Sequence, residues 1–182
     1  MKKSVTLIEL MVAVALLGVI LLTAATLDVA ARKFFNASDR VAEMQCEVSP
    51  VLLRIKRDIN QVSGNIMDPG MNIALSTPWR HRFRKIDGTW CAYVWNTTNR
   101  TIEYYNSVPA YSLPWGSPTL TEIVSAGVTA FDLAYVAGSM ATVRVSITSC
   151  YDPTGGLGPC GSNNNPQITL ATSAHALSQS AR

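Results

Sequence analysis

Residues 5–27 read VTLIELMVAVALLGVILLTAATL, and this stretch decides what kind of fold the chain can have. It contains a single charged side chain, that of Glu9. An α-helix rises about 1.5 Å per residue, so about 20 apolar residues cross the hydrocarbon layer of a membrane. A carboxylate in that layer costs about 2.5–3.5 kcal/mol on insertion scales, so we expect Glu9 to have a partner or a task.

A cleaved secretory signal is the rival interpretation of this segment. Such a signal has an apolar core of about 7–15 residues and a small-residue exit site. Here the apolar run is longer, and Ala30-Ala31-Arg32 does not resemble such a site. The sequence therefore favours a membrane helix that the protein retains.

The N-terminus resembles the class III signal of type IV pilins and type II secretion pseudopilins, in the run Met-Lys-Lys-Ser-Val-Thr-Leu-Ile-Glu-Leu-Met-Val-Ala. The resemblance implies that residues 1–4 are a leader peptide. It also implies that prepilin peptidase cleaves between Ser4 and Val5 and that the new amine of Val5 is N-methylated. Ser4 stands where the family prefers Gly, and Val5 stands where Phe or Met is usual.

The resemblance gives Glu9 a role in subunit assembly. In that family, the glutamate of an incoming subunit attracts the N-terminal amine of its neighbour, here that of Val5, and low dielectric strengthens the attraction. The alternative is a glutamate that is protonated in lipid or reaches the headgroups near the start of the helix.

Charge predicts the orientation of the chain. Lys2 and Lys3 precede the apolar run, so the positive-inside rule places the N-terminus in the cytoplasm and the residues after Leu27 in the periplasm. The chain has 15 basic and 12 acidic side chains, and two of the basic ones, Lys2 and Lys3, belong to the leader. Without the leader the chain is close to neutral, so its net charge does not indicate any class of partner. We expect a single-pass protein of the bacterial inner membrane that later enters a filament or reaches the cell surface.

A long amphipathic helix is predicted to continue beyond the membrane, over residues 28–62. Ser49-Pro50 indicates either a kink or the cap and first turn of a new helix. Apolar residues recur in steps of three and four, which is typical of a helix that buries one face. This stripe comprises Phe34, Ala37, Val41, Met44, Val48, Leu52, Ile55, Ile59 and Val62.

Residues 63–182 are predicted to form a β-rich globular head. Asp87-Gly88 is a strong hairpin signal between strands at 82–86 and 89–95. Further strands are expected at 100–105, 120–124, 128–136, 142–150 and 167–173. With the helix, these strands predict an α+β fold in which the long helix packs on an antiparallel sheet.

A second resemblance is to J-type minor pseudopilins and W-type minor pilins. It rests on three stretches, Leu53–Gln61, Gly127–Tyr135 and the strand pair that begins at Val143 and Ile168. The Leu-Arg-Asn that often ends that group is absent here. This resemblance implies a minor subunit at or near the filament tip, which joins other pilin subunits through an inner-membrane assembly platform.

Four cysteines in an exported domain favour disulfides, because the periplasm is oxidising. Cys150 and Cys160 enclose a loop rich in Pro and Gly, so we expect these two to be bonded. Cys46 and Cys91 would then join the helix to the sheet, one of three possible connectivities. No close cysteine spacing indicates zinc, and His81 and His175 have no spaced partner.

The run from Arg80 to Lys85 is the densest charge in the sequence. On a strand it would place Arg80, Arg82 and Arg84 on one face, where they could contact DNA phosphates. The row could equally be the solvated face of a basic edge strand, which discourages edge pairing. Because there is only one such row, we favour the edge strand and expect no nucleic-acid partner.

Metal and catalytic sites have little support. Asp152 and the run Asn163-Asn164-Asn165 offer oxygen ligands for calcium but lack an Asp-rich spacing, so we expect no metal or other cofactor. No nucleophile motif or phosphate loop is present, so we expect no enzyme. The leading hypothesis is a structural subunit of a type IV pilus or type II secretion pseudopilus. The alternatives are a pilin-like module that binds DNA or a surface, and a periplasmic domain that is merely anchored.

Overall fold

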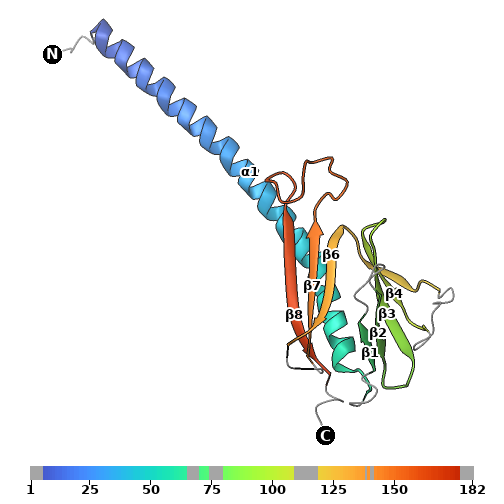
Figure 1. The fold of residues 1–182 in the computed structure, drawn as a ribbon. Helices are drawn as coiled ribbons and strands as arrows, with labels where there is room; N and C mark the ends of the chain where they lie inside the picture. The colour runs from blue at the N-terminus through green and yellow to red at the C-terminus, as the bar shows by residue number, and fades with distance from the viewer. Residues whose placement is uncertain are drawn as a thin grey trace. The chain divides into compact units, whose positions relative to one another are not determined.

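The computed structural model describes residues 6–64, 70–73, 80–108, 119–137, 139 and 142–176. In these residues it has one helix, α1 (Leu7–Asn60), and strands β1 to β8. The chain divides into two compact units, Met1–Asp39 and Arg40–Arg182. The first unit contains the N-terminal part of α1, and the second contains the rest of the helix and the strands (Figure 1). The α+β, pilin-like fold class predicted from the sequence is confirmed.

Helix α1 continues through Pro50, so no new helix begins there. Pro50 lies on the exposed face of the helix, away from the buried stripe. The predicted stripe is buried from Met44 onward, whereas Phe34 is 71% exposed. The buried residues of the helix are Met44, Val48, Val51, Leu52, Ile55 and Ile59.

The first sheet is antiparallel with the strand order β1-β2-β3-β4-β5. Its strands are β1 (Met71–Ile73), β2 (Arg80–Arg84), β3 (Trp90–Asn96), β4 (Thr101–Tyr105) and β5 (Glu122–Ser125). The sequence predicted each of these strands to within a few residues, except β1. That strand is only three residues long and carries too little pattern to be recognised.

The predicted hairpin joins β2 to β3, with Arg84 opposite Trp90. Lys85 N–H donates to the Thr89 carbonyl at 2.8 Å, and Gly88 N–H donates to the Lys85 carbonyl at 3.0 Å. Gly88 has φ +83°, a left-handed conformation that glycine adopts without steric cost. The loop is therefore a turn of three residues that ends at Gly88, and not the two-residue turn that Asp-Gly alone suggests.

The second sheet is antiparallel with the order β6-β7-β8. Its strands are β6 (Val128–Tyr135), β7 (Thr142–Cys150) and β8 (Gln167–His175). Along β7, buried Val143, Val145 and Ile147 alternate with more exposed polar residues, as the sequence predicted. The sheet therefore has one apolar face and one polar face.

One hydrophobic core joins the helix to both sheets within the second unit. Figure 1 shows this part of α1 running alongside β8 and the other strands of its sheet. The fully buried large side chains of this core include Ile55 and Ile59 from α1, Tyr93 and Phe83 from the first sheet, and Leu133 and Ile147 from the second. A smaller cluster on the opposite face of the first sheet contains Trp90, Ala92, Val94 and Val108.

Candidate functional site

Glu9 lies in the first turn of α1, where its carboxylate bonds to Thr6. Both the backbone N–H and the hydroxyl of Thr6 donate to Glu9 Oε2, at 2.9 and 3.0 Å. In return, Glu9 N–H lies 3.3 Å from the hydroxyl oxygen of Thr6. This reciprocal pair is a capping box, in which two residues three apart satisfy the free N–H groups at a helix start.

The sequence reasoning missed the role of Thr6. The signal was present, because Thr-x-x-Glu before an apolar run is the pattern of a capping box. In the isolated chain, Glu9 is therefore not an unpartnered charge, because its own helix start satisfies one carboxylate oxygen. A partner that Glu9 meets in an assembly has to replace the hydrogen bonds that Thr6 donates to the carboxylate or form bonds in addition to them.

The helix that follows Glu9 is apolar and exposed. Among the described residues, α1 is the one helix that is long and apolar enough to cross a membrane, and none of its most apolar window is buried. Asp28 and Arg32 close this segment with an exposed ion pair of 2.9 Å, one helical turn apart. The expected cleavage site between Ser4 and Val5, and the amine of Val5, lie outside the described residues.

Cys150 and Cys160 form the predicted disulfide, with an S–S distance of 2.11 Å. The loop that they close is also held by the buried side chain of Asn165. Its amide nitrogen donates to the carbonyls of Asp152 at 2.8 Å and Gly158 at 2.7 Å, and its oxygen accepts from Asp152 N–H at 2.8 Å. Loop and disulfide form one ordered unit at the end of β7.

The predicted pairing of Cys46 with Cys91 is wrong, because both are free thiols. Cys46 is exposed, two residues from buried Met44 and from buried Val48, so it lies on the helix face opposite the core. Cys91 is buried in β3, and burial raises the pKa of its thiol to about 11. The two cysteines therefore face different surroundings.

The basic row lies on one face of β2 as expected, but the strand is not an edge. β1 and β3 flank β2 in the sheet, and Arg82 is only 6% exposed. Burial, and then the charge of Arg80, lower the pKa of Arg82. The row Arg80, Arg82 and Arg84 is thus neither a solvated edge nor an open track of three cations for DNA.

His81 projects from the opposite face of β2 into the core. It is fully buried, and neither ring nitrogen has a hydrogen-bond partner among the residues that the structure describes. Its ring meets that of Phe131 in β6 edge to face, with 5.3 Å between the ring centroids. Burial lowers the pKa of His81 to about 4, so the side chain is neutral at ordinary pH. His81 acts as a packing residue between the two sheets.

The helix is tied to the first sheet by a polar contact within the stretch Leu53–Gln61. The hydroxyl of Tyr93 in β3 donates to Asp58 Oδ2 at 2.7 Å. Burial and the nearby Asp58 carboxylate raise the pKa of Tyr93. Asp58 therefore fixes where the helix lies on the sheet.

Asp152, one of the oxygen ligands that the sequence offers for calcium, is bonded within its own loop. Asp152 Oδ1 accepts from Thr154 N–H at 3.0 Å, and its Oδ2 accepts from Leu157 N–H at 2.8 Å. Among the residues that the structure describes, no three His, Cys, Asp or Glu side chains gather as metal ligands do.

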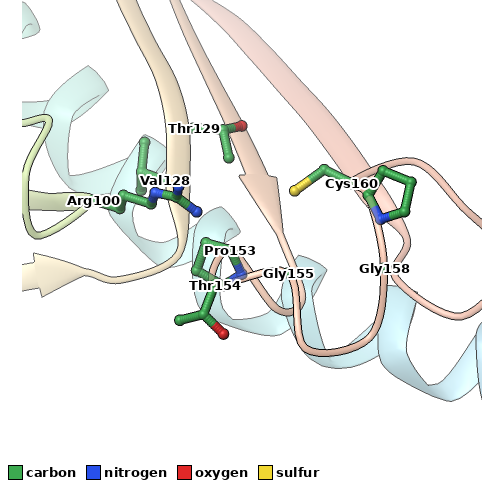
Figure 2. A pocket seen from close by; sticks show the side chains of 9 residues that line it. Arg100, Val128, Thr129, Pro153, Thr154, Gly155, Gly158 and Cys160 are labelled. Atoms are coloured by element: carbon green, nitrogen blue, oxygen red, sulfur yellow. The ribbon is translucent and has the colours of Figure 1, made fainter.

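Beside the disulfide loop lies a pocket of about 430 Å³. Figure 2 shows Arg100 and Val128 on one side of it and Cys160 on the other, with the loop residues Pro153 and Thr154 below. Arg100 is the charged side chain among its described lining residues. The Thr154 hydroxyl is already bonded to Asp152, so we assign no chemistry to this pocket.

Residues 1–25 match the family described as the prokaryotic N-terminal methylation motif. No curated protein and no solved structure matches the chain. The likeness to J-type pseudopilins and W-type pilins therefore stays a prediction. The motif marks structural proteins that prepilin peptidase processes and that assemble with other pilin subunits. With this motif at its start, followed by a long apolar helix and antiparallel sheets, the chain carries the class III signal of type IV pilins and pseudopilins on a pilin-like α+β fold.

Proposed function

We propose that the chain is a minor subunit, located at or near the tip, of a type IV pilus or type II secretion pseudopilus. One observation carries the proposal: Glu9, which belongs to the methylation motif, lies in the first turn of an exposed apolar helix. A helix that had only to anchor the protein would not need this charge, because glutamine can complete the same cap and a carboxylate is costly in lipid. A subunit that must leave the membrane and join others has a use for it.

Before assembly, the apolar segment holds the subunit in the inner membrane, and the head lies in the periplasm. The disulfide between Cys150 and Cys160 supports this location, because such bonds persist in oxidising compartments. During assembly, the inner-membrane platform moves the helix out of the lipid, and Glu9 meets the N-methylated amine of Val5 on a neighbouring subunit. The tip position rests on the resemblance to minor subunits.

The Thr6 contact allows the charge of Glu9 to be tested apart from its capping role. Glutamine also fills the last position of a capping box, so Glu9→Gln keeps the cap and removes the charge. Thr6→Val removes the two hydroxyl contacts of the cap, leaves the backbone N–H that donates to Glu9, and keeps the charge. Glu47→Gln removes an exposed charge farther along α1 and serves as the matched control.

The assay is recovery of each full-length variant in filaments sheared from cells, beside its level in the membrane. We expect Glu9→Gln to lower recovery at least about tenfold, since breaking a buried ion pair costs about 3–5 kcal/mol. Glu47→Gln should be recovered normally. The mass of the native protein should correspond to a chain that begins at methylated Val5. An intact Met1, with normal recovery of Glu9→Gln, would instead identify a merely anchored periplasmic domain.

A further inference from the structure

Sheet edges expose backbone groups that can pair with another chain, and most edges of this head are protected. Strand β1 has only three residues. Strand β5 has four, its register against β4 shifts, and its Glu122 is paired with Arg54 at 2.6 Å. The start of β6 is bonded to the turn between β3 and β4, because Val128 N–H donates to the Arg100 carbonyl at 2.9 Å.

Strand β8 differs from these three edges. It has nine residues, Gln167–His175, and pairs with β7 alone. It contains no Lys, Arg, Asp, Glu, Pro or Gly, which are the residues that commonly block an edge. Its register against β7 is regular from end to end. Its side chains are exposed or half-buried except that of Ala174.

One hydrogen bond shows which backbone groups of β8 face away from β7. His175 N–H donates to the side-chain oxygen of Asn60, at 3.2 Å, and not to its β7 neighbour Thr142. Backbone groups alternate in direction along an antiparallel strand. The N–H and C=O groups of Gln167, Thr169, Ala171 and Ser173 therefore also point outward. In the part of the chain that the structure describes, these outward groups have no hydrogen-bond partner.

Side-chain contacts with the rest of its sheet also hold β8 in place. The hydroxyls of Thr169 in β8 and Thr148 in β7 are 2.9 Å apart, and the Gln167 side chain donates to Thr129 in β6 at 3.3 Å. These contacts tie β8 to the sheet, so a partner would not have to order it. Four outward backbone positions are enough for a short added strand.

We propose that β8 accepts an extended strand from a neighbouring, different subunit of the filament, through main-chain hydrogen bonds. This inference rests on the proposed function, which supplies neighbouring subunits. Strand β8 is bonded to α1 near both of its ends, by Arg40 with the Asn164 carbonyl and by Asn60 with His175. The edge therefore lies along the helix, about which neighbouring subunits gather.

Symmetric pairing with a second copy does not suit this edge. The two bonds to α1 show that residues 40–60 and β8 run in the same direction. Two β8 edges related by a two-fold axis would pair antiparallel and would set their helices antiparallel as well. Subunits that leave one membrane in the same orientation cannot pair in that way. The partner strand therefore comes from a different subunit.

The first test is amide hydrogen exchange, on the full-length chain in native filaments and on the same chain in detergent micelles. Assembly should slow exchange at Thr169, Ala171 and Ser173 at least about tenfold, because pairing protects their outward amides. Exchange at Leu170 and Thr172 should not change, since these amides already face β7. Equal exchange of all five amides in both states would overturn the proposal.

The second test uses Ala171→Pro, which removes an outward N–H, with Ala171→Ser as the control that keeps it. Recovery of Ala171→Pro in filaments should fall at least about fivefold, as expected for the loss of one hydrogen bond. Normal recovery would count against β8 pairing. If Ala171→Pro does not fold, the exchange experiment decides.

A photo-crosslinker at position 171 identifies the occupant, with position 130 on the exposed face of β6 as the control. An adduct of position 171 with another filament subunit supports the proposal. An adduct with a second copy of this chain, or with an exported protein, overturns it. The filament assay separates the failure of this inference from the failure of the proposed function. If filaments contain the chain but the β8 amides are unprotected, only the pairing of β8 is refuted. If the chain is absent from filaments, the proposed function and the pairing of β8 are both refuted.

Discussion

At the scale of single residues, buried His81 should make the head less stable in acid. Its pKa is about 4 in the folded protein, against 6.5 for an unperturbed histidine. As pH falls from about 6.5 to 4, His81 is protonated in the unfolded chain but stays neutral in the folded protein. The free energy of unfolding therefore has its full value above pH 6.5 and decreases as pH falls through this window. The loss should reach about 3 kcal/mol by pH 4.

The measurement is urea unfolding of the full-length chain in micelles between pH 7 and pH 4. The control is His81→Leu, which fills the space between the two sheets with an apolar side chain that cannot be protonated. Carboxylates titrate in both proteins, so the difference between the two pH slopes isolates His81. Parallel slopes would show that the buried imidazole does not control acid stability.

At the scale of elements, the disulfide loop should be a separable source of stability. Cys150 and Cys160 are ten residues apart, and closing a loop of that length restricts the unfolded chain by about 2–3 kcal/mol. We expect the double variant Cys150→Ala, Cys160→Ala to lose that amount in urea unfolding. Cys46→Ala removes an exposed free thiol and should change nothing. If the double variant loses less than about 0.5 kcal/mol, the bonds of Asn165 suffice to hold the loop.

The elements that the sequence predicted correctly are those with local signals. The turn at Asp87-Gly88 marked the β2–β3 hairpin, alternation marked β7, and the short cysteine separation marked the disulfide. What it missed depends on contacts between distant residues. Strand β1 exists only by pairing with β2, and that pairing moves Arg82 from an expected edge into the sheet.

The same distinction applies to the candidate site. Glu9 was recognisable from the motif around it, and its capping box with Thr6 was readable from a spacing of three residues. The pairing of Cys46 with Cys91 failed although the predicted stripe already indicated the reason: Cys46 lies two residues from Met44 and from Val48, and so on the helix face opposite the core. The open edge of β8 could not be predicted either, since strand order is a property of the whole sheet.

At the scale of the whole molecule, the head should fold without the apolar segment, because the two compact units divide at Asp39. The buried core residues of α1 begin at Met44. A chain that begins at Asp28 therefore keeps every buried helix residue, and one that begins at Leu52 loses Met44, Val48 and Val51. Burial of each such side chain contributes about 1.5–3 kcal/mol. Three of them approach the total stability of a typical domain, about 5–15 kcal/mol.

We therefore expect the chain from Asp28 to be a soluble monomer whose urea midpoint equals that of the full-length protein in micelles, and the chain from Leu52 to be unfolded. Near-ultraviolet circular dichroism and the oxidation state of Cys150 and Cys160 report the folded head in both. Unfolding of the longer chain would mean that residues before Asp28 stabilise the head. A folded shorter chain would mean that the first turns of the buried stripe are dispensable, and that the length of α1 beyond the membrane serves assembly and not the core.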